Sequence, residues 1–467
     1  MKKTKIVGTI GPSSMDYKVL KKLVQAGLNV VRINLSHAKL DDMNKTLNNV
    51  KKLREELNIP LPIMIDTRGP EIRVRTFKTG SVEIKKGQKF IFTGRNIEGD
   101  NTQVSLNAPS IVKCVSVGDK ILAVNGLISF NVIDIKGKDI ITKALNSGVI
   151  SNRKSLSIPG VKYSTPYLND ADKHDILWAI QNDIEYVAAS FVNSKDDVAV
   201  LRKFIETNGG DMKIISKIES QIGVDNMDEI IASSDAIMVA RGDLGVEVPM
   251  ERLPAIQKTM IKKCVTNGKP VITATEMLES MITNKRPTRA EISDIANAIY
   301  DGTSCVMLSG ETANGKYPVE SVKTMATVAE ETEKHLTNSY VIENVKLKSI
   351  ADLISHSAVD AADSQDIKAI LSYTDSGYTA GLISRFRPKV HIIGATPNEK
   401  VYRQLDLLWG VRPVLTPVYN TTDEMFEIAN ETAKKNKFVT AGDNMVVTCG
   451  TPKVNGGTNL MKIVKVK

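Results

Sequence analysis

Short apolar runs alternate with longer amphipathic segments over much of the first two thirds of the chain. Residues 5–11, 29–36 and 62–67 are apolar runs of strand length, whereas residues 16–27 and 40–58 carry apolar positions at helical spacing. The first of these helical segments ends at a glycine, which is a common stop signal for a helix. The pattern therefore predicts strands and helices in alternation.

The alternation breaks between residues 69 and 165. This segment contains short strand-like runs separated by turn sequences such as Glu98-Gly99-Asp100 and Val117-Gly118-Asp119, which predict a small all-β insert. Strand signals then resume at residues 185–192, 213–219, 236–243, 271–276 and 305–309. Helices are predicted between and after them, at residues 171–183, 195–208, 225–233, 249–267, 289–300 and 319–335.

Outside the insert, the pattern gives eight strands that are each followed by a helix. This number and order predict a (β/α)₈ barrel, a fold of about 250 residues, and a doubly wound open sheet is the alternative. A further helix at 350–362 and strands at 367–373, 390–395, 412–415, 444–448 and 459–467 indicate a separate α/β domain. We therefore expect an α/β protein with a barrel at 1–69 and 166–342, an inserted β domain at 70–165 and a C-terminal α/β domain at 346–467.

Two stretches place ionisable residues at the end of an apolar run. They are residues 215–219, which contain Lys217 and Glu219, and residues 238–245, which contain Asp243. An unpaired charge is costly on a strand that is buried on both faces, so these side chains are expected where strands open into a cleft. Two carboxylates and an ammonium group suggest a divalent metal beside a cation that meets an anionic substrate. A buried ion pair that only holds strands together is the alternative.

Polar residues also end most of the other predicted barrel strands. In a barrel these ends converge on one mouth, where active sites of this fold lie, whereas an open sheet would spread them along a line. The polar strand ends are Arg32, Asn34 and Ser36 on the second strand, Asp66 and Thr67 on the third, Arg241 on the sixth, Thr275 on the seventh, and Ser309 and Glu311 after the eighth.

Composition narrows the classes of partner. The net charge is +9, but the chain has no arginine-rich run and only 5% aromatic residues, which argues against nucleic-acid binding. The scattered lysines indicate a plain solvated surface, and a bias toward phosphorylated metabolites is the alternative. No run approaches the roughly 20 apolar residues of a membrane helix, and the basic start lacks the apolar core of a signal peptide. The four cysteines are far apart, which suits a reducing cytosol. We therefore expect a cytoplasmic protein that binds neither membrane nor nucleic acid.

A second candidate site lies in the C-terminal domain. Residues 374–379 connect a predicted strand to a helix and contain Thr374, Ser376, Gly377 and Thr379. Small hydroxyl residues and a glycine at a helix N-terminus can cradle a phosphate group. A simple helix cap without a ligand is the alternative.

Taken together, the motifs resemble the pyruvate kinase family over almost the whole chain. That resemblance implies a barrel, a β lid inserted after the third strand and a C-terminal effector domain. It also implies the transfer of a phosphoryl group from phosphoenolpyruvate to ADP, which gives pyruvate and ATP. The matching stretches are residues 5–14 (KIVGTIGPSS), 32–37 (RINLSH), 66–73 (DTRGPEIR), 215–219 (ISKIE), 238–245 (MVARGDLG), 273–281 (TATEMLESM), 286–291 (RPTRAE) and 307–313 (MLSGETA).

The resemblance assigns catalytic roles to matching residues. Lys217 would stabilise charge on the transferred phosphoryl group, and Arg32 would hold the same phosphate. Glu219 and Asp243 would bind Mg²⁺ or Mn²⁺. The backbone of Gly242 and Asp243 would receive the substrate carboxylate. Thr275 would contact the substrate and take part in proton delivery to the enol carbon.

It also assigns the binding sites around the reaction. A homotetramer is usual in the family, and a phosphorylated effector is expected at the phosphate cradle of the C-terminal domain. The implied K⁺ ligands are Asn34, Ser36, Asp66 and Thr67. The implied contacts to ADP or ATP are Asn34, His37, Arg73 and Lys154, and the implied effector contacts are Thr374, Ser376, Gly377 and Thr379.

Some positions depart from the family pattern. Glu276 stands where glutamine is usual, Asn125 where the lid usually has aspartate, and Ser304 where aspartate is common. Glu71 keeps the form that is associated with K⁺ dependence. These departures leave one alternative open, a catalytically silent paralogue that senses metabolites on the same scaffold.

Overall fold

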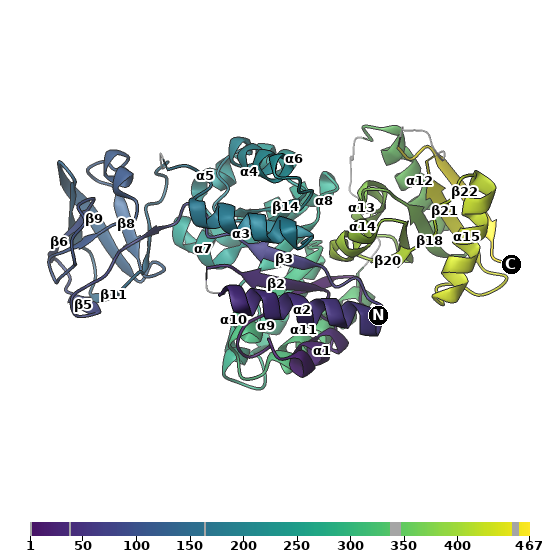
Figure 1. The fold of residues 1–467 in the computed structure, drawn as a ribbon, viewed down its shortest axis with the longest axis horizontal. Coiled ribbons are helices and arrows are strands. Elements are labelled where there is room, and N and C mark those ends of the chain that lie inside the picture. Colours follow the sequence, from purple (N-terminus) through teal and green to yellow (C-terminus); the bar gives the residue numbers. More distant parts are fainter. Residues whose placement is uncertain (1, 37–38, 163–164, 337–346, 451–456) are drawn as a thin grey trace.

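The molecule consists of three parts in a row, with the barrel between the lid and the C-terminal domain (Figure 1). This computed structural model describes residues 2–36, 39–162, 165–336, 347–450 and 457–467. Among the helices of these residues, none has the length and apolar character needed to cross a membrane.

Eight parallel strands close into the central barrel, which confirms the (β/α)₈ prediction and excludes the open sheet. Their apolar residues are buried because one strand face packs inside the barrel and the other packs against the helices. In spatial order the strands are β1 (Lys5–Thr9), β17 (Cys305–Leu308), β16 (Val271–Ala274), β15 (Ala236–Ala240), β14 (Lys213–Ile218), β13 (Tyr186–Ala189), β3 (Ile63–Asp66) and β2 (Val30–Asn34).

Helices surround the barrel, and local capping groups fix several of their starts. The Asp16 carboxylate accepts hydrogen bonds from the first turn of α1, and Ser194 and Thr288 form capping boxes before α4 and α9. The helices are α1 (Tyr17–Gln25), α2 (Leu40–Leu57), α3 (Asp170–Gln181), α4 (Lys195–Thr207), α5 (Gln221–Asp225), α6 (Met227–Ser233), α7 (Arg241–Glu247), α8 (Leu253–Thr266), α9 (Arg289–Tyr300), α10 (Gly310–Ala313) and α11 (Pro318–Lys334), with short 3₁₀ turns η2 (Met250–Arg252) and η3 (Glu279–Ile282).

Every barrel strand is shorter than the sequence pattern predicts, and the early ends of β15 and β16 have a clear physical cause. The strand predicted over 236–243 ends at Ala240, because the next residues form helix α7. The strand predicted over 271–276 ends at Ala274, because Thr275 and Glu276 both have positive φ angles that no β-strand accommodates. Both strands therefore turn sharply at the mouth of the barrel.

The lid is built from short antiparallel and mixed strands with its own apolar core. We propose that it spans residues 70–165, limits that fall between β3 and β4 and between β12 and α3. One sheet has the order β4 (Ile72–Arg73), β12 (Ser155–Ser157), β8 (Lys120–Ala123), β9 (Ile128–Lys136), β10 (Asp139–Ala144), β6 (Lys89–Thr93) and β7 (Gln103–Ser105); β11 (Gly148–Ser151) pairs with β5 (Ser81–Ile84), and η1 (Pro109–Lys113) is a 3₁₀ turn.

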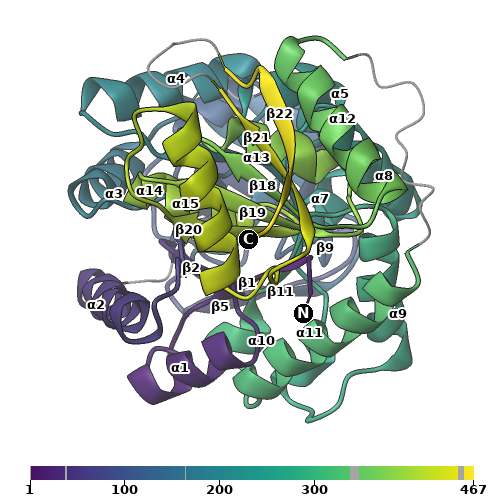
Figure 2. The ribbon, with the colours of Figure 1, turned by 90° about the vertical axis from the view of Figure 1, so that its right-hand side faces the viewer.

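The C-terminal part is a five-stranded sheet flanked by helices, and it faces the viewer in front of the barrel in Figure 2. The proposed limit at residues 342–346 lies outside the described residues. The strand order is β20 (Val411–Leu415), β19 (His391–Thr396), β18 (Ile367–Tyr373), β21 (Asn444–Cys449) and β22 (Leu460–Lys465), and the helices are α12 (Ile350–Ser364), α13 (Tyr378–Arg385), α14 (Glu399–Gln404), η4 (Leu405–Leu407) and α15 (Thr422–Lys435).

The C-terminal domain seals the end of the barrel where the strands begin. Leu407 of η4 joins the apolar cluster inside the barrel, which includes Tyr186. Beside it, the buried Lys5 Nζ lies 2.6 Å from Asp406 Oδ1 and donates to the Val411 carbonyl at 2.7 Å. Burial lowers the pKa of Lys5, and the Asp406 carboxylate opposes this shift. Only the opposite end of the barrel is left to form an open mouth.

We expect Asp406→Ala to reduce the free energy of unfolding by about 3 kcal/mol or more, because it leaves Lys5 buried without its charge partner. Thermal melting followed by circular dichroism measures the effect. The double variant Lys5→Met/Asp406→Leu, which replaces the pair by apolar side chains, is the control and should melt close to the wild type. Equal melting temperatures for Asp406→Ala and the wild type would contradict the assignment.

Candidate active site

Two cations share one carboxylate at the mouth of the barrel. Asp66, at the end of β3, accepts hydrogen bonds from Arg32 Nε at 2.7 Å and from Lys217 Nζ at 3.0 Å, one on each carboxylate oxygen. Arg32 also donates to Thr9 Oγ1 at 2.8 Å. All of these side chains are buried. Asp66 therefore holds two positive groups side by side, although their strands, β2 and β14, are separated by β3 and β13 in the barrel.

The opposite charges of Asp66 and Lys217 keep each other ionised. Burial by itself raises the pKa of Asp66, but the charges of Arg32 and Lys217 bring it below its usual value. Burial by itself lowers the pKa of Lys217, but the carboxylates of Asp66 and Glu219 bring it above its usual value. At neutral pH Asp66 is therefore ionised and Lys217 carries its full charge.

Glu219 follows β14 and is fully buried beside Lys217. Its Oε2 accepts a hydrogen bond from the Phe191 backbone N–H at 2.7 Å. Its Oε1 lies 3.0 Å from Lys217 Nζ but has no hydrogen-bond partner. Burial raises the pKa of Glu219, Lys217 opposes the shift, and Asp243 adds to it. A buried carboxylate oxygen that lacks a hydrogen-bond partner is suited to binding a cation.

The residues present fit a divalent metal ion. Asp243 lies in the first turn of α7, and its charge acts on both Lys217 and Glu219. In the described part of the chain, no group of three or more His, Cys, Asp or Glu side chains is arranged to hold a metal. Mg²⁺ commonly uses only one or two carboxylates and completes its shell with water and substrate oxygens. Glu219 and Asp243 are such a pair.

The seventh strand presents Thr275 in a constrained turn. Thr275 and Glu276 have φ angles of +66° and +53°, in the left-handed region. The Thr275 hydroxyl accepts a hydrogen bond from the Gly242 N–H at 2.8 Å. Arg241 holds the turn, because its Nε donates to the Thr275 carbonyl at 3.2 Å while Nη1 pairs with Asp294 at 2.7 Å. Thr275 and the start of α7 therefore form one unit.

The residues expected to bind K⁺ come from the adjacent ends of β2 and β3. Asn34 and Asp66 are partners in the register of these strands. Asn34 Oδ1 accepts a hydrogen bond from the Ser36 N–H at 3.1 Å, and Thr67 Oγ1 accepts one from the Ser190 N–H at 3.1 Å. The structure thus brings these oxygen-bearing side chains to one side of the mouth.

The residues expected to meet the nucleotide are only partly described. Arg73 forms an ion pair with Glu71 at 2.7 Å and donates from Nη1 to the Arg153 carbonyl at 2.8 Å. Lys154 follows Arg153 and is exposed on the neighbouring strand segment of the lid. His37 lies outside the described residues. Arg73 and Lys154 therefore share one part of the lid.

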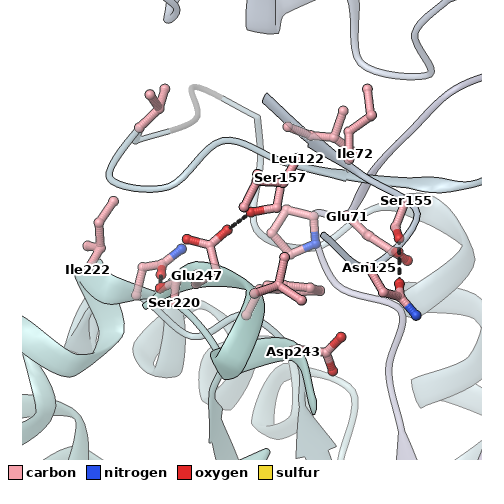
Figure 3. A pocket seen from close by; sticks show the side chains of 16 residues that line it. Glu71, Ile72, Leu122, Asn125, Ser155, Ser157, Ser220, Ile222, Asp243 and Glu247 are labelled. Carbon is pink, nitrogen blue, oxygen red and sulfur yellow. Dashed lines mark hydrogen bonds between the residues drawn. The ribbon is translucent and has the colours of Figure 1, made fainter. Parts of the chain in front are cut away.

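A pocket separates the lid from the barrel, and Figure 3 shows the side chains around it. Ser157 of the lid donates a hydrogen bond to Glu247 at the end of α7. Ser155 donates to Asn125 at 3.0 Å, within the lid. Asp243, at the start of α7, lines the same pocket. The lid thus contacts the helix that carries a candidate metal ligand.

The expected effector loop surrounds the start of α13. The Thr374 hydroxyl accepts a hydrogen bond from the Gly377 N–H at 2.9 Å, and Gly377 has a φ of +84°. The Thr379 hydroxyl is bonded to Thr458. Ser376 and Gly377 line a pocket between the C-terminal domain and the barrel. The loop is therefore both a helix cap and part of a pocket wall.

The positions that depart from the family pattern lie in different places. Glu276 is exposed beside Thr275 at the mouth, and Asn125 has a φ of +54° in a tight turn of the lid. Ser304 lies at the other end of the barrel, where its hydroxyl accepts hydrogen bonds at 3.3 Å from the Val271 N–H and from Arg387. The change at Ser304 therefore concerns contact with the C-terminal domain and not the mouth.

The sequence analysis missed the end of the fourth strand. Ser190 and Phe191 follow β13 and contact Lys217 and Glu219. Ser190 could have indicated a site here, because it directly follows the apolar residues of β13. Polar residues at the ends of other strands were interpreted in that way.

Comparisons with known proteins agree with the geometry. A family model described as "Pyruvate kinase, barrel domain" matches residues 1–322, and one described as "Pyruvate kinase, alpha/beta domain" matches residues 352–464. A pyruvate kinase of Geobacillus stearothermophilus is 45% identical over 99% of this chain and 80% of its own length. One of Clostridium acetobutylicum is 43% identical over 99% of both chains. None of these matches favours a catalytically silent sensor.

A solved structure shares the whole architecture. It is a pyruvate kinase of Cryptosporidium parvum, which is 38% identical, covers 100% of this chain and 96% of its own, and superposes with a TM-score of 0.95. The resemblance inferred from the motifs is thereby confirmed. The chain belongs to the pyruvate kinase family, the glycolytic enzymes that transfer the phosphoryl group of phosphoenolpyruvate to ADP.

Proposed function

We propose that the chain carries out this transfer with the charged cluster around Asp66 at the mouth of the barrel. The observation that carries the proposal is the placement of Lys217 between Asp66 and Glu219, at 3.0 Å from each. Phosphoryl transfer asks the protein mainly for position and countercharge, and not for a nucleophile. A fixed ammonium beside a second cation meets that requirement.

Arg32 and Lys217 bind the phosphoryl group in this proposal. Because both are anchored on Asp66, neither needs to reorganise when negative charge develops on the transferred group. Their burial keeps water away from the charges, which strengthens their attraction for the phosphate. Arg32 mainly holds the phosphoryl group, and Lys217 stabilises the negative charge on that group during the transfer.

Glu219 and Asp243 hold Mg²⁺ or Mn²⁺ in the proposed site, and Asn34, Ser36, Asp66 and Thr67 hold K⁺. When bound, these ions supply countercharge to the phosphoryl and enolate oxygens. The backbone turn at Gly242 and Asp243 receives the substrate carboxylate, and the Thr275 hydroxyl bonded to that turn contacts the substrate near the enol carbon.

The lid supplies the nucleotide contacts. Arg73 and Lys154 face the phosphates of ADP or ATP, together with Asn34 and His37 from the barrel. Closure over the mouth excludes water, which would otherwise accept the phosphoryl group. The contact of the lid with Glu247 of α7 supports this arrangement.

We also propose a phosphorylated effector at Thr374, Ser376, Gly377 and Thr379, and a homotetrameric enzyme that works in the cytoplasm. The N–H groups at the start of α13 and the lysines Lys213 and Lys269 of the adjoining pocket wall support an anionic ligand. The homotetramer rests on family membership alone, and the location rests on family membership together with the widely spaced cysteines.

Lys217→Ala should lower kcat at least about 100-fold, because it removes one preorganised charge from the transferred group. A lactate dehydrogenase-coupled assay with phosphoenolpyruvate, ADP, Mg²⁺ and K⁺ measures the loss. Lys195→Ala, which removes an exposed lysine at the start of α4, is the matched control and should keep full turnover. Normal turnover of Lys217→Ala would refute the role of this residue.

Replacing K⁺ by Na⁺ should depress the rate, and Glu71→Lys should relieve the need for K⁺ by supplying a positive charge. Glu71→Gln is the control, because it also removes the partner of Arg73 but adds no ammonium group, and it should stay dependent on K⁺. The same coupled assay, run in K⁺ and in Na⁺ at equal ionic strength, measures the K⁺ dependence of each protein. A wild type that is equally active in both salts shows that the K⁺ site is wrongly assigned.

A panel of sugar phosphates and nucleotides should include one that shifts the saturation curve for phosphoenolpyruvate. Ser376→Asp should abolish that shift, because it puts a carboxylate where the phosphate is proposed to lie. Thr422→Asp adds the same charge at the start of α15, outside this pocket, and should keep the response. A curve that no compound moves counts against the effector site.

A further inference from the structure

The turn after the fourth barrel strand lies at the centre of the charged cluster. Ser190 is only 2% exposed, and its hydroxyl is within hydrogen-bond distance of Lys217 Nζ at 2.8 Å and of Asp66 Oδ1 at 3.1 Å. The next residue, Phe191, has a φ of +53°, and its N–H points to Glu219. A bulky residue takes up this conformation only when its surroundings enforce it.

The hydroxyl of Ser190 has a defined orientation. Because the Lys217 ammonium can only donate, the hydroxyl accepts that bond and directs its own proton to the Thr67 carbonyl at 2.7 Å or to Asp66. The backbone of Ser190 is held on both sides, since its N–H donates to Thr67 Oγ1 at 3.1 Å and its carbonyl accepts from Tyr167 at 3.0 Å. The acceptor that Lys217 meets is therefore rigid.

The Lys217 ammonium has three N–H bonds, and their partners show how Ser190 orients it. Asp66 and Ser190 each take one N–H of Lys217. Glu219 is as close as Asp66, at 3.0 Å, but its near oxygen makes no hydrogen bond. One N–H is thus left for an incoming anionic group. Ser190 provides this orientation as a neutral acceptor, so it does not cancel any of the charge on Lys217.

We propose that Ser190 is a positioning residue that keeps one N–H of the Lys217 ammonium directed at the transferred phosphoryl group, while Glu219 stays beside the ammonium without a hydrogen bond to it. The same turn presents the Phe191 N–H to Glu219, so one loop orients both the ammonium and the carboxylate. The proposal rests on the catalytic role proposed for Lys217. It assigns a task to the end of the fourth barrel strand, where no site residue was predicted.

The test is a double-mutant cycle in the coupled assay. Ser190→Ala should lower kcat about tenfold or more, the scale seen when the outer hydrogen-bond partner of a site residue is lost, with a smaller change in KM for phosphoenolpyruvate. Combined with Lys217→Ala, it should cause little further loss, because a residue that acts through Lys217 has nothing left to orient. Ser190→Thr, which retains the hydroxyl, should recover most of the turnover.

The control is Ser194→Ala, which removes the cap of α4 only four residues further on. It should lower the melting temperature and leave kcat unchanged, which separates lost stability from lost positioning. An unchanged kcat in Ser190→Ala, or an equal loss in the presence and absence of Lys217, overturns the proposal. Normal turnover of Lys217→Ala itself would instead refute the proposed function, so the two failures are distinguishable.

Discussion

The candidate active site depends on one buried carboxylate, that of Asp66. Asp66 binds Arg32 through one oxygen and Lys217 through the other, and it remains charged because both cations lower its pKa. Attraction between these groups is strong because little water screens them, but each one has given up its hydration to lie there. Removing Asp66 would take the ion-pair partner from Arg32 and leave Lys217 with Glu219 alone. The cluster is therefore a rigid set of charges, which suits a reaction whose main demand is countercharge.

The two ends of the barrel differ in the side chains that line them and in the domain that contacts them. At the strand starts, Leu407 fills the interior and the Lys5–Asp406 pair joins the barrel to the C-terminal domain. At the strand ends, polar groups replace apolar ones and the lid contacts α7 through Glu247. Helix α7 carries Asp243 in its first turn and Glu247 at its last residue, so the lid and a candidate metal ligand share one short element. The lid and the candidate metal ligand are thereby connected through one helix.

Much of the fold could be predicted, because eight alternations of apolar runs and amphipathic segments leave few architectures open. The strands of the lid lie within residues 69–165, where the alternation breaks. The strand ends at residues 240 and 274 were placed wrongly. Their termination depends on the positive φ of Thr275 and on the bonds from Arg241 to that turn, which come from different βα units. Apolar periodicity carries no information about such contacts.

The sequence by itself determined which residues could not remain inside a packed strand. Lys217, Glu219 and Asp66 each end an apolar run, and the cost of burying a lone charge requires such groups to find partners. Only the tertiary structure decided which partners they found. The closed barrel brings the ends of β3, β13 and β14 together, so that residues 66, 190 and 217 are in contact although they are far apart along the chain. Hydrogen bonds depend on distances of a few tenths of an ångström, and only the completed circle of strands sets those distances.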